Sequence, residues 1–170
     1  MNKKNNTGHR GAVYAGSFDP PTNGHLWMIE RGANLFNTLT VAIGENSAKR
    51  AGFSIEKRIE MLRKITAHLK NVTVCAFHDE YLVHFAARQK ASYILRGIRN
   101  HTDYGYEQAL RYLNADLVEE ITTIFLMPPR ELAEVSSSTI KALIGPKGWE
   151  RVIKKLVPRP VFEAIKQSRK

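Results

Sequence analysis

The chain has 170 residues, of which 43% are hydrophobic and 25% are charged, a composition typical of one globular domain. It contains no apolar run near the roughly 20 residues of a membrane-spanning helix, and residues 1–10 lack the apolar stretch of a secretory signal. The single Cys75 excludes an internal disulfide and is typical of a reducing compartment. We therefore expect a cytoplasmic protein without membrane contact, with a flexible leader over residues 1–10 and a single domain over residues 11–170.

The net charge of +10 arises from 26 Lys and Arg residues against 16 Asp and Glu residues. A basic surface attracts anions in general, including nucleotides, phosphorylated metabolites, nucleic acids and acidic lipids. Part of the excess lies in the last 25 residues, where we interpret most basic side chains as solvated helix faces. Composition alone leaves open both an enzyme of anionic substrates and a nucleic-acid binder.

Short β-rich runs alternate with longer helical patterns along the chain. Strands are expected over Ala12–Ala15, Leu39–Ile43, Val72–Ala76, Tyr93–Leu95 and Thr122–Met127. Helices are expected over His25–Phe36, Ile55–His68, Tyr81–Gln89, Tyr104–Asp116, Thr139–Ile144 and Val161–Gln167. The alternation predicts an α/β, Rossmann-like fold: a five-stranded parallel sheet with helices on both faces and a short C-terminal helical tail. Loops that follow parallel strands open on one rim, where such folds bind ligands.

The segment from Gly16 to His25 follows the first predicted strand and leads into a helix. Gly16 and Gly24 allow close approach of the backbone, and the helix start directs N–H groups and a positive dipole end at one place. His25, in the first helical turn, can donate a hydrogen bond to a phosphoryl oxygen. A histidine at a helix start without a ligand is the alternative, but the strand–turn–helix context favours phosphate chemistry.

Two later segments also offer groups that bind phosphate. Arg96-Gly97-Ile98-Arg99 ends the fourth predicted strand, and paired guanidinium groups suit bidentate contacts with phosphates. Glu134-Val135-Ser136-Ser137-Ser138 opens a helix with hydroxyl and N–H donors, and Ser137 or Ser138 is expected to cap that helix. The glycine-rich patterns G-x-G-x-x-G and G-x-x-x-x-G-K-[ST] are both absent, so if a nucleotide binds, another kind of site holds it.

The run Thr22-Asn23-Gly24-His25 resembles the T/H-x-G-H motif of the nucleotidyltransferase superfamily, with Thr22 in place of the first histidine. The longer run from Gly16 is similar to the opening of the bacterial phosphopantetheine adenylyltransferases, which make dephospho-coenzyme A from ATP and 4′-phosphopantetheine. The R-G-I-R run, the segment from Asp103 to Gln108 and the V-S-S-S run resemble later motifs of that family. The similarity spans Ala12 to Ile165, and it weakens in the tail from Trp149 onward.

The resemblance implies a role for each residue at a matching position. His25 would stabilise the transition state. ATP would be bound by Ser17, Phe18, His25, Gly97, Ile98, Arg99, Glu107, Leu132, Ala133, Glu134, Val135, Ser136, Ser137 and Ser138. The acceptor would be bound by Ser17, Lys49, Leu82 and Arg96, with Arg50 open as an alternative to Lys49. It also implies that coenzyme A is a feedback ligand and that the protein is a homohexamer. No cluster of carboxylates in the sequence suggests a metal site of the protein itself, so Mg²⁺ is expected to travel with ATP.

Three other functions stay open at this point. The acceptor could be another phosphate, such as nicotinamide mononucleotide or glycerol phosphate, although the D-Y-x-Y-E and R-G-I-R segments favour phosphopantetheine. The charge of +10 would suit a nucleic-acid-binding protein, but no recognised binding motif is visible, so we expect no nucleic acid as partner. A catalytically weak paralogue that senses coenzyme A is the third alternative, and the intact His25 argues against it.

Overall fold

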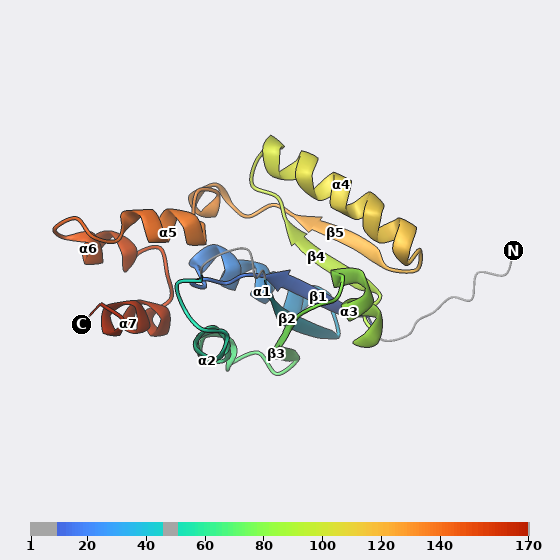
Figure 1. Cartoon of the computed structure of the whole chain (residues 1–170), viewed down its shortest axis with the longest axis horizontal. Coiled ribbons are helices and arrows are strands. Elements are labelled where there is room, and N and C mark those ends of the chain that lie inside the picture. Colours follow the sequence, from blue (N-terminus) through green and yellow to red (C-terminus); the bar gives the residue numbers. More distant parts are fainter. Residues whose placement is uncertain (1–9, 46–50, 170) are drawn as a thin grey trace, which may run out of the picture.

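The computed structural model describes residues 10–45 and 51–169, which form an α/β fold around a five-stranded sheet (Figure 1). The strands are β1 (Gly11–Gly16), β2 (Thr38–Gly44), β3 (Val72–Phe77), β4 (Tyr93–Gly97) and β5 (Thr122–Leu126). The α-helices are α1 (Asn23–Leu35), α2 (Ile55–Thr66), α3 (Leu82–Arg88), α4 (His101–Leu117), α5 (Ser137–Leu143), α6 (Trp149–Ile153) and α7 (Arg159–Gln167), and a 3₁₀ turn spans Arg130–Leu132. The predicted fold class is confirmed.

All pairs of neighbouring strands are parallel, in the order β3-β2-β1-β4-β5. The chain runs outward from β1 to β2 and β3, and then crosses back to place β4 on the other side of β1. The carboxyl ends of β1 and β4 therefore form the topological switch point, which is where open α/β sheets bind ligands.

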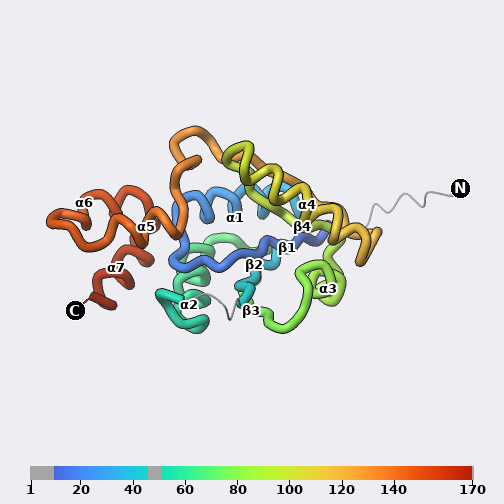
Figure 2. The backbone as a smooth tube through the Cα atoms, turned by 45° about the horizontal axis from the view of Figure 1, so that its top comes forward, coloured from blue at the N-terminus to red at the C-terminus, as the bar shows by residue number. Residues whose placement is uncertain are grey.

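The two faces of the sheet are covered by different helices (Figure 2). Alternate residues of β1 point to opposite faces. Ala12 and Tyr14 belong to a hydrophobic cluster with side chains of α1, α2 and α7, whereas Val13 and Ala15 belong to a second cluster with α3. The prediction of helices on both faces is thus confirmed, and the helical tail packs through α7 on α2.

Hydrogen bonds at their first turns fix where several helices begin. Ser54 accepts a hydrogen bond from the Lys57 amide at the start of α2, and Asn100 accepts one from the Asp103 amide at the start of α4. Because of the Asn100 cap, α4 begins at His101, three residues before the predicted start at Tyr104. Such caps satisfy backbone N–H groups that have no partner within the helix.

The structure corrects the sequence prediction at two places in the C-terminal third. Ser136, rather than Ser137 or Ser138, caps α5, because its Oγ accepts the Thr139 amide hydrogen at 3.1 Å. Helix α6 and the 3₁₀ turn over Arg130–Leu132 were not expected. Helix α6 has only five residues and follows Gly148, whose φ of 84° lies in the left-handed region that favours glycine.

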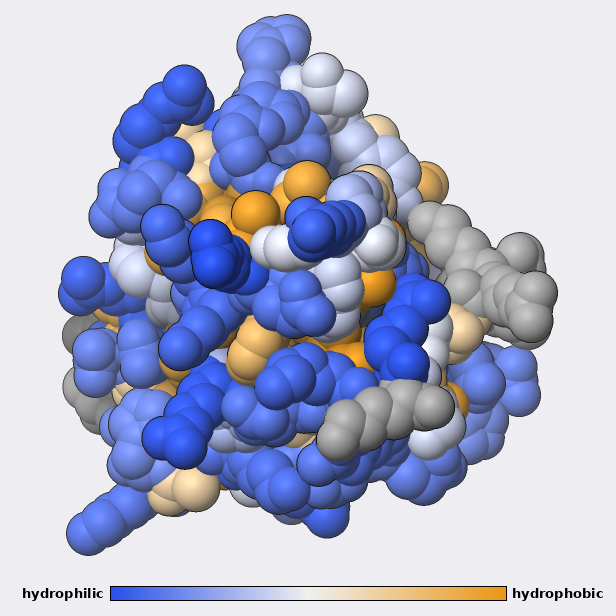
Figure 3. Space-filling view, turned by 90° about the vertical axis from the view of Figure 1, so that its left-hand side faces the viewer, coloured by the Kyte–Doolittle hydropathy of each residue, from blue (hydrophilic) through white to orange (hydrophobic). Residues whose placement is uncertain are grey.

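The end of the molecule formed by α5, α6 and α7 presents a mainly hydrophilic surface (Figure 3). The apolar side chains of α7, among them Val161 and Ile165, are instead buried in the first cluster. No helix in the described part of the chain has the length and the apolar character needed to cross a membrane.

Candidate active site

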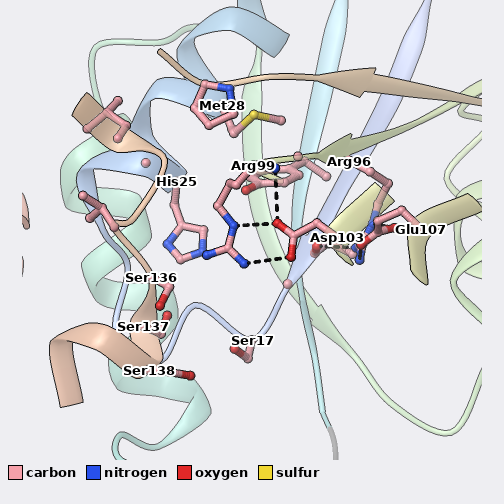
Figure 4. Close-up of a pocket in the computed structure, with 18 of the residues that line it drawn as sticks. Ser17, His25, Met28, Arg96, Arg99, Asp103, Glu107, Ser136, Ser137 and Ser138 are labelled. Carbon is pink, nitrogen blue, oxygen red and sulfur yellow. Dashed lines mark hydrogen bonds and ion pairs between the residues drawn. The ribbon is translucent and has the colours of Figure 1, made fainter. Parts of the chain in front are cut away.

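A pocket of about 380 Å³ opens where β1 and β4 end, between the start of α1, the side of α4 and the segment that leads into α5. This volume lies within the range of small-molecule sites. The lining residues are Tyr14, Ala15, Gly16, Ser17, Gly24, His25, Met28, Arg96, Gly97, Arg99, Asp103, Tyr106, Glu107, Pro128, Leu132, Val135, Ser136, Ser137 and Ser138 (Figure 4).

His25 is held at the start of α1 by a reciprocal pair of hydrogen bonds with Thr22. The Thr22 Oγ1 accepts the His25 amide hydrogen at 3.3 Å, and Nδ1 of His25 accepts the Thr22 amide hydrogen at 3.0 Å. An imidazole nitrogen that accepts a backbone N–H carries no proton, so the neutral ring is protonated at Nε2. Nε2 has no hydrogen-bond partner among the described residues, and the ring lines the pocket. His25 therefore offers the pocket one N–H donor.

The surroundings of His25 keep it neutral. Burial of the ring, together with the positive charge of Arg99, lowers the pKa of His25 from 6.5 to about 4. The ring packs edge-on against Phe18, with ring centroids 5.1 Å apart. Phe18 is fully buried, so its side chain supports the His25 ring from within the core.

Gly24 allows the first turn of α1 to lie close to the segment that leads into α5. A Cβ atom at residue 24 would lie 3.2 Å from the Val135 carbonyl oxygen and 3.5 Å from the Thr22 Oγ1. The distance to the carbonyl oxygen is shorter than an ordinary van der Waals contact, so a side chain at residue 24 would push the two segments apart. Close packing of these two segments thus explains the glycine in the T-N-G-H run.

Arg96 and Glu107 form a bidentate ion pair in the wall of the pocket. The guanidinium donates from Nε to Oε2 at 2.7 Å and from Nη2 to Oε1 at 2.5 Å, and Nη1 donates to the Ala15 carbonyl at 3.0 Å. Both side chains are mostly buried, at 21% and 10% exposure. Burial opposes the charge of Arg96, but the bonds to Glu107 outweigh it and raise the pKa of the guanidinium. Arg96 thereby joins the ends of β1 and β4 with α4.

Arg99 and Asp103 form a second, more exposed ion pair, with Nε 2.8 Å from Oδ2. The Arg99 amide also donates to Oδ2 at 3.2 Å, so the start of α4 holds the Arg99 side chain beside His25 (Figure 4). The two arginines of the R-G-I-R run thus both face the pocket, each with its own carboxylate.

The three serines at the start of α5 have different partners. Ser136 caps the helix, and the Ser137 hydroxyl donates to the Pro20 carbonyl at 2.9 Å. Ser138 lines the pocket, and its hydroxyl makes no hydrogen bond within the described residues. Ser138 is therefore the serine whose hydroxyl is most available to a ligand.

The pocket brings together most residues that the sequence assigned to ATP. Those lining it are Ser17, His25, Gly97, Arg99, Glu107, Leu132, Val135, Ser136, Ser137 and Ser138. The side chains of Phe18, Ile98, Ala133 and Glu134 do not line it, although each adjoins a residue that does. Ile98 is buried, and its amide donates to the Leu126 carbonyl at 2.9 Å.

The residues that the sequence assigned to the acceptor do not all line the pocket. Ser17 and Arg96 line the pocket, whereas Leu82 lies at the start of α3 and packs against the second hydrophobic cluster. Lys49 and Arg50 lie outside the described residues.

Several lining residues had no role in the sequence analysis. Tyr14 lies on β1 and Met28 on the buried face of α1, positions that are typical of the core rather than of a binding site. Asp103 and Tyr106 lie in the D-Y-x-Y-E segment, whose spacing places Asp103, Tyr106 and Glu107 on neighbouring turns of α4. This helical spacing was the feature of the sequence that could have shown that the three side chains lie on one face of α4.

The pocket provides no free set of carboxylates for a metal ion. Its two acidic side chains, Asp103 and Glu107, are each in an ion pair with an arginine. Across the residues that the structure describes, no group of three or more His, Cys, Asp or Glu side chains could hold a metal ion. A divalent cation here would need oxygen ligands from a bound substrate.

Comparison with known proteins identifies relatives of this chain. Residues 13–143 match the family model described as cytidylyltransferase-like. The phosphopantetheine adenylyltransferase of Chromobacterium violaceum is 52% identical over 91% of this chain and 94% of that protein. The enzyme of the same name from Neisseria meningitidis serogroup C is 51% identical over 92% of both chains.

Solved structures show the same fold at lower sequence similarity. Nicotinic acid mononucleotide adenylyltransferase of Plasmodium falciparum, complexed with NaAD, superposes with a TM-score of 0.71 over 94% of this chain and 96% of that chain. The sequence identity is 16%, so this likeness concerns the fold alone.

Proposed function

The chain belongs to the phosphopantetheine adenylyltransferase family, within the cytidylyltransferase-like proteins, and we propose that its pocket performs that reaction with His25 as the central group. The enzyme transfers the adenylyl group of ATP to 4′-phosphopantetheine, giving dephospho-coenzyme A and pyrophosphate in coenzyme A biosynthesis. The observation that carries the assignment of His25 is its Nε2 proton, which has no partner among the described residues and faces the pocket at the positive end of α1.

The reaction is an in-line displacement at phosphorus. An oxygen of the acceptor phosphate attacks the α-phosphorus of ATP, the new P–O bond forms, and the bond to the bridging oxygen breaks as pyrophosphate leaves. Negative charge accumulates on the oxygens of the crowded α-phosphorus. The N–H at Nε2 of His25 donates to one of these oxygens, and because Thr22 fixes the ring beforehand, no reorganisation is needed.

On the acceptor side, we assign the phosphate of 4′-phosphopantetheine to Arg96, Lys49 and Ser17. A guanidinium has five N–H bonds, and three of those on Arg96 are used by Glu107 and Ala15, which leaves two for a phosphate. The ion pair holds the group in one orientation, which lowers the entropy cost of binding. Leu82 is assigned to the pantetheine arm, and Arg50 is the alternative to Lys49.

On the donor side, we assign the phosphates of ATP to Arg99 and to the segment from Leu132 to Ser138. Ser138 offers a free hydroxyl, and Arg99 adds positive charge beside His25. Gly97 lines the same space, and it is assigned to the nucleotide together with Phe18 and Ile98, each of which is next to a lining residue in the sequence. Glu107 contributes through Arg96, because both of its oxygens accept from that guanidinium.

Mg²⁺ is proposed as the metal of the reaction, and it would arrive bound to the phosphates of ATP. The pocket fits this arrangement, because Asp103 and Glu107 are both paired with arginines and the hydroxyl of Ser138 is free. When bound, the ion neutralises charge on the leaving pyrophosphate. Every other contribution in this scheme comes from side chains and backbone of the protein.

The homohexamer is also a proposal, and a face of α4 supports self-association. Of the seventeen residues of α4, Glu107 alone is buried. Tyr112, Leu113 and Leu117 on this helix are exposed, as is Met127 after β5 at the sheet edge. Exposed apolar side chains gathered on one element mark interaction surfaces. A second copy of the chain would cover them.

We further propose a cytoplasmic location and feedback by coenzyme A. Coenzyme A contains both the pantetheine arm and an adenine nucleotide, so it can occupy the acceptor and donor sides together. Competition with both substrates is therefore expected.

The acceptor is tested by incubating the protein with ATP and Mg²⁺ and one of three phosphates: 4′-phosphopantetheine, nicotinamide mononucleotide or glycerol phosphate. Mass spectrometry of the products and a pyrophosphate assay report the transfer. We expect dephospho-coenzyme A and pyrophosphate in equal amounts with 4′-phosphopantetheine, and no dinucleotide with nicotinamide mononucleotide. Preferred adenylation of either other acceptor would overturn the assignment.

A further inference from the structure

Asp19 has a buried carboxylate close to the pocket, and this carboxylate has no assigned role in the adenylyl transfer. Its side chain is 7% exposed and does not line the pocket. It accepts the Gly52 amide hydrogen at Oδ2 (2.8 Å) and the Phe53 amide hydrogen at Oδ1 (2.9 Å), and the Lys141 ammonium lies 3.1 Å from Oδ2. These three donors come from two segments that are far apart in the sequence.

The bonds of Asp19 connect three parts of the fold. Asp19 lies in the loop between β1 and α1, Gly52 and Phe53 form the turn before α2, and Lys141 lies on α5. A second bond supports each connection. Arg58 of α2 donates to the Ser17 carbonyl at 2.9 Å, and Ser137 of α5 donates to the Pro20 carbonyl at 2.9 Å.

The loop between β1 and α1 thus has contacts with both sides of the reaction. Ser17, at its start, lines the pocket on the acceptor side, and the serines at the start of α5 line it on the donor side. A side chain at residue 52 would crowd Asp19, because a Cβ atom there would lie 3.3 Å from Asp19 Oδ1. The carboxylate therefore requires close approach of the turn before α2.

The hydrogen-bond donors around Asp19 keep its carboxylate ionised. Burial favours the neutral acid, but the hydrogen bonds from the Gly52 amide, the Lys141 ammonium and the Phe53 amide outweigh burial and lower the pKa of Asp19. Hydrogen bonds to a charged acceptor are stronger than bonds between neutral groups. An ionised Asp19 consequently holds the three segments at fixed distances.

We propose that Asp19 is a positioning residue that holds the acceptor side and the donor side of the pocket in a fixed relative position, and that Lys141 transmits its effect to the serines at the start of α5. This inference rests on the proposed adenylyl transfer. Asp19 touches neither substrate in this scheme. It acts through Ser17 and the turn before α2 on one side, and through Lys141 on the other. Alignment of this kind matters because displacement of a reacting group by about 1 Å can lower a rate by up to about a hundredfold.

The two variants Lys141→Met and Asp19→Asn separate these effects. Lys141 is half exposed, so its replacement should leave the fold intact. We expect Lys141→Met to raise KM for ATP about tenfold, with KM for 4′-phosphopantetheine unchanged within about twofold. Asp19→Asn retains the shape but cannot accept from all three donors, and we expect it to raise both KM values about tenfold.

The double variant tests the connection itself. If Lys141 acts through Asp19, then adding Lys141→Met to Asp19→Asn should raise KM for ATP by less than about twofold further. The matched control is Lys64→Met, which removes an exposed ion pair of α2 with Glu60 at 2.6 Å. The control should leave both KM values as in the wild type.

Two results would overturn the inference while the wild type is active. One is unchanged KM values in both single variants, and the other is an effect in the double variant equal to the product of the single effects. Wild-type protein that does not adenylate 4′-phosphopantetheine would overturn the proposed function instead. In that case calorimetric affinity for ATP decides the inference, and an affinity unchanged by Lys141→Met would overturn it too.

Discussion

The backbone amide of Thr22 donates a hydrogen bond to Nδ1 of His25 over 3.0 Å. This bond assigns the only proton of the neutral ring to Nε2, the nitrogen that lies toward the pocket. A threonine before the histidine suits the arrangement, because its side chain also accepts the His25 amide hydrogen. The start of the helix and the state of its key side chain are thus fixed by the same two residues.

The protonation state of His25 can be measured directly by ¹⁵N NMR of the imidazole nitrogens. With the pKa of His25 lowered to about 4, the ring should be neutral and protonated at Nε2 throughout the neutral range. The ring binds a proton more readily when the chain is unfolded, so the free energy of unfolding should fall as the pH drops from 6.5 towards 4. His25→Gln should lack this part of the pH dependence. A His25 that titrates between pH 6 and 7 in the folded protein would contradict the assignment.

The Arg96–Glu107 pair should contribute strongly to stability. Glu107→Gln leaves a mostly buried guanidinium without its counter-charge, and we expect a loss of about 3–5 kcal/mol in the free energy of unfolding. Urea denaturation measures this loss. In the variant Arg96→Met/Glu107→Leu, most of the stability should return, but adenylyl transfer should be lost because Arg96 no longer binds the acceptor phosphate. Activity that recovers with stability would show that Arg96 has no contact with substrate.

Gly24 should be sensitive to the addition of a single methyl group. Because a Cβ atom would lie 3.2 Å from the Val135 carbonyl oxygen, Gly24→Ala should displace the segment before α5 and raise KM for ATP several-fold. The control is Gly105→Ala in α4, where a Cβ atom meets nothing within 4 Å. This control should keep KM and stabilise the helix by up to about 1 kcal/mol. Equal KM values for the two variants would contradict the packing role of Gly24.

Self-association should depend on the exposed apolar side chains of α4. Leu113→Glu introduces a charge where we expect a second copy of the chain to pack, so it should convert the assembly to smaller species. Sedimentation velocity measures the change. Lys90→Glu, an exposed residue between α3 and β4, is the matched control for a new surface charge. A Leu113→Glu protein that sediments like the wild type would exclude this face from the interface.

The sequence was sufficient for the sheet and for most of the pocket, because both follow from local patterns. Near-continuous apolar runs are typical of buried parallel strands, and all five were found within two residues of their predicted bounds. Since loops at the carboxyl ends of such strands share one rim, the residues after β1 and β4 could be placed together. His25 and Arg99 meet there as expected.

The sequence could not predict which partner each polar side chain has. Asp19 and Lys141 are 122 residues apart, and the pairing of Arg96 with Glu107 likewise joins a strand end to the side of a helix. The cap of α5 was also beyond prediction, because three adjacent serines are chemically equal and only the path of the chain selects Ser136. Pairings of this kind depend on tertiary packing rather than on local propensity.

The most direct test compares His25→Ala with the wild type in two measurements on the same preparations. Calorimetry gives the affinity for ATP, and a pyrophosphate assay with 4′-phosphopantetheine gives kcat. We predict an ATP affinity within a few-fold of the wild type and a kcat lower by about 10²–10³, because the Nε2 donor acts mainly on charge that develops in the transition state. A variant with nearly normal turnover would contradict the central claim that His25 stabilises the transition state of adenylyl transfer.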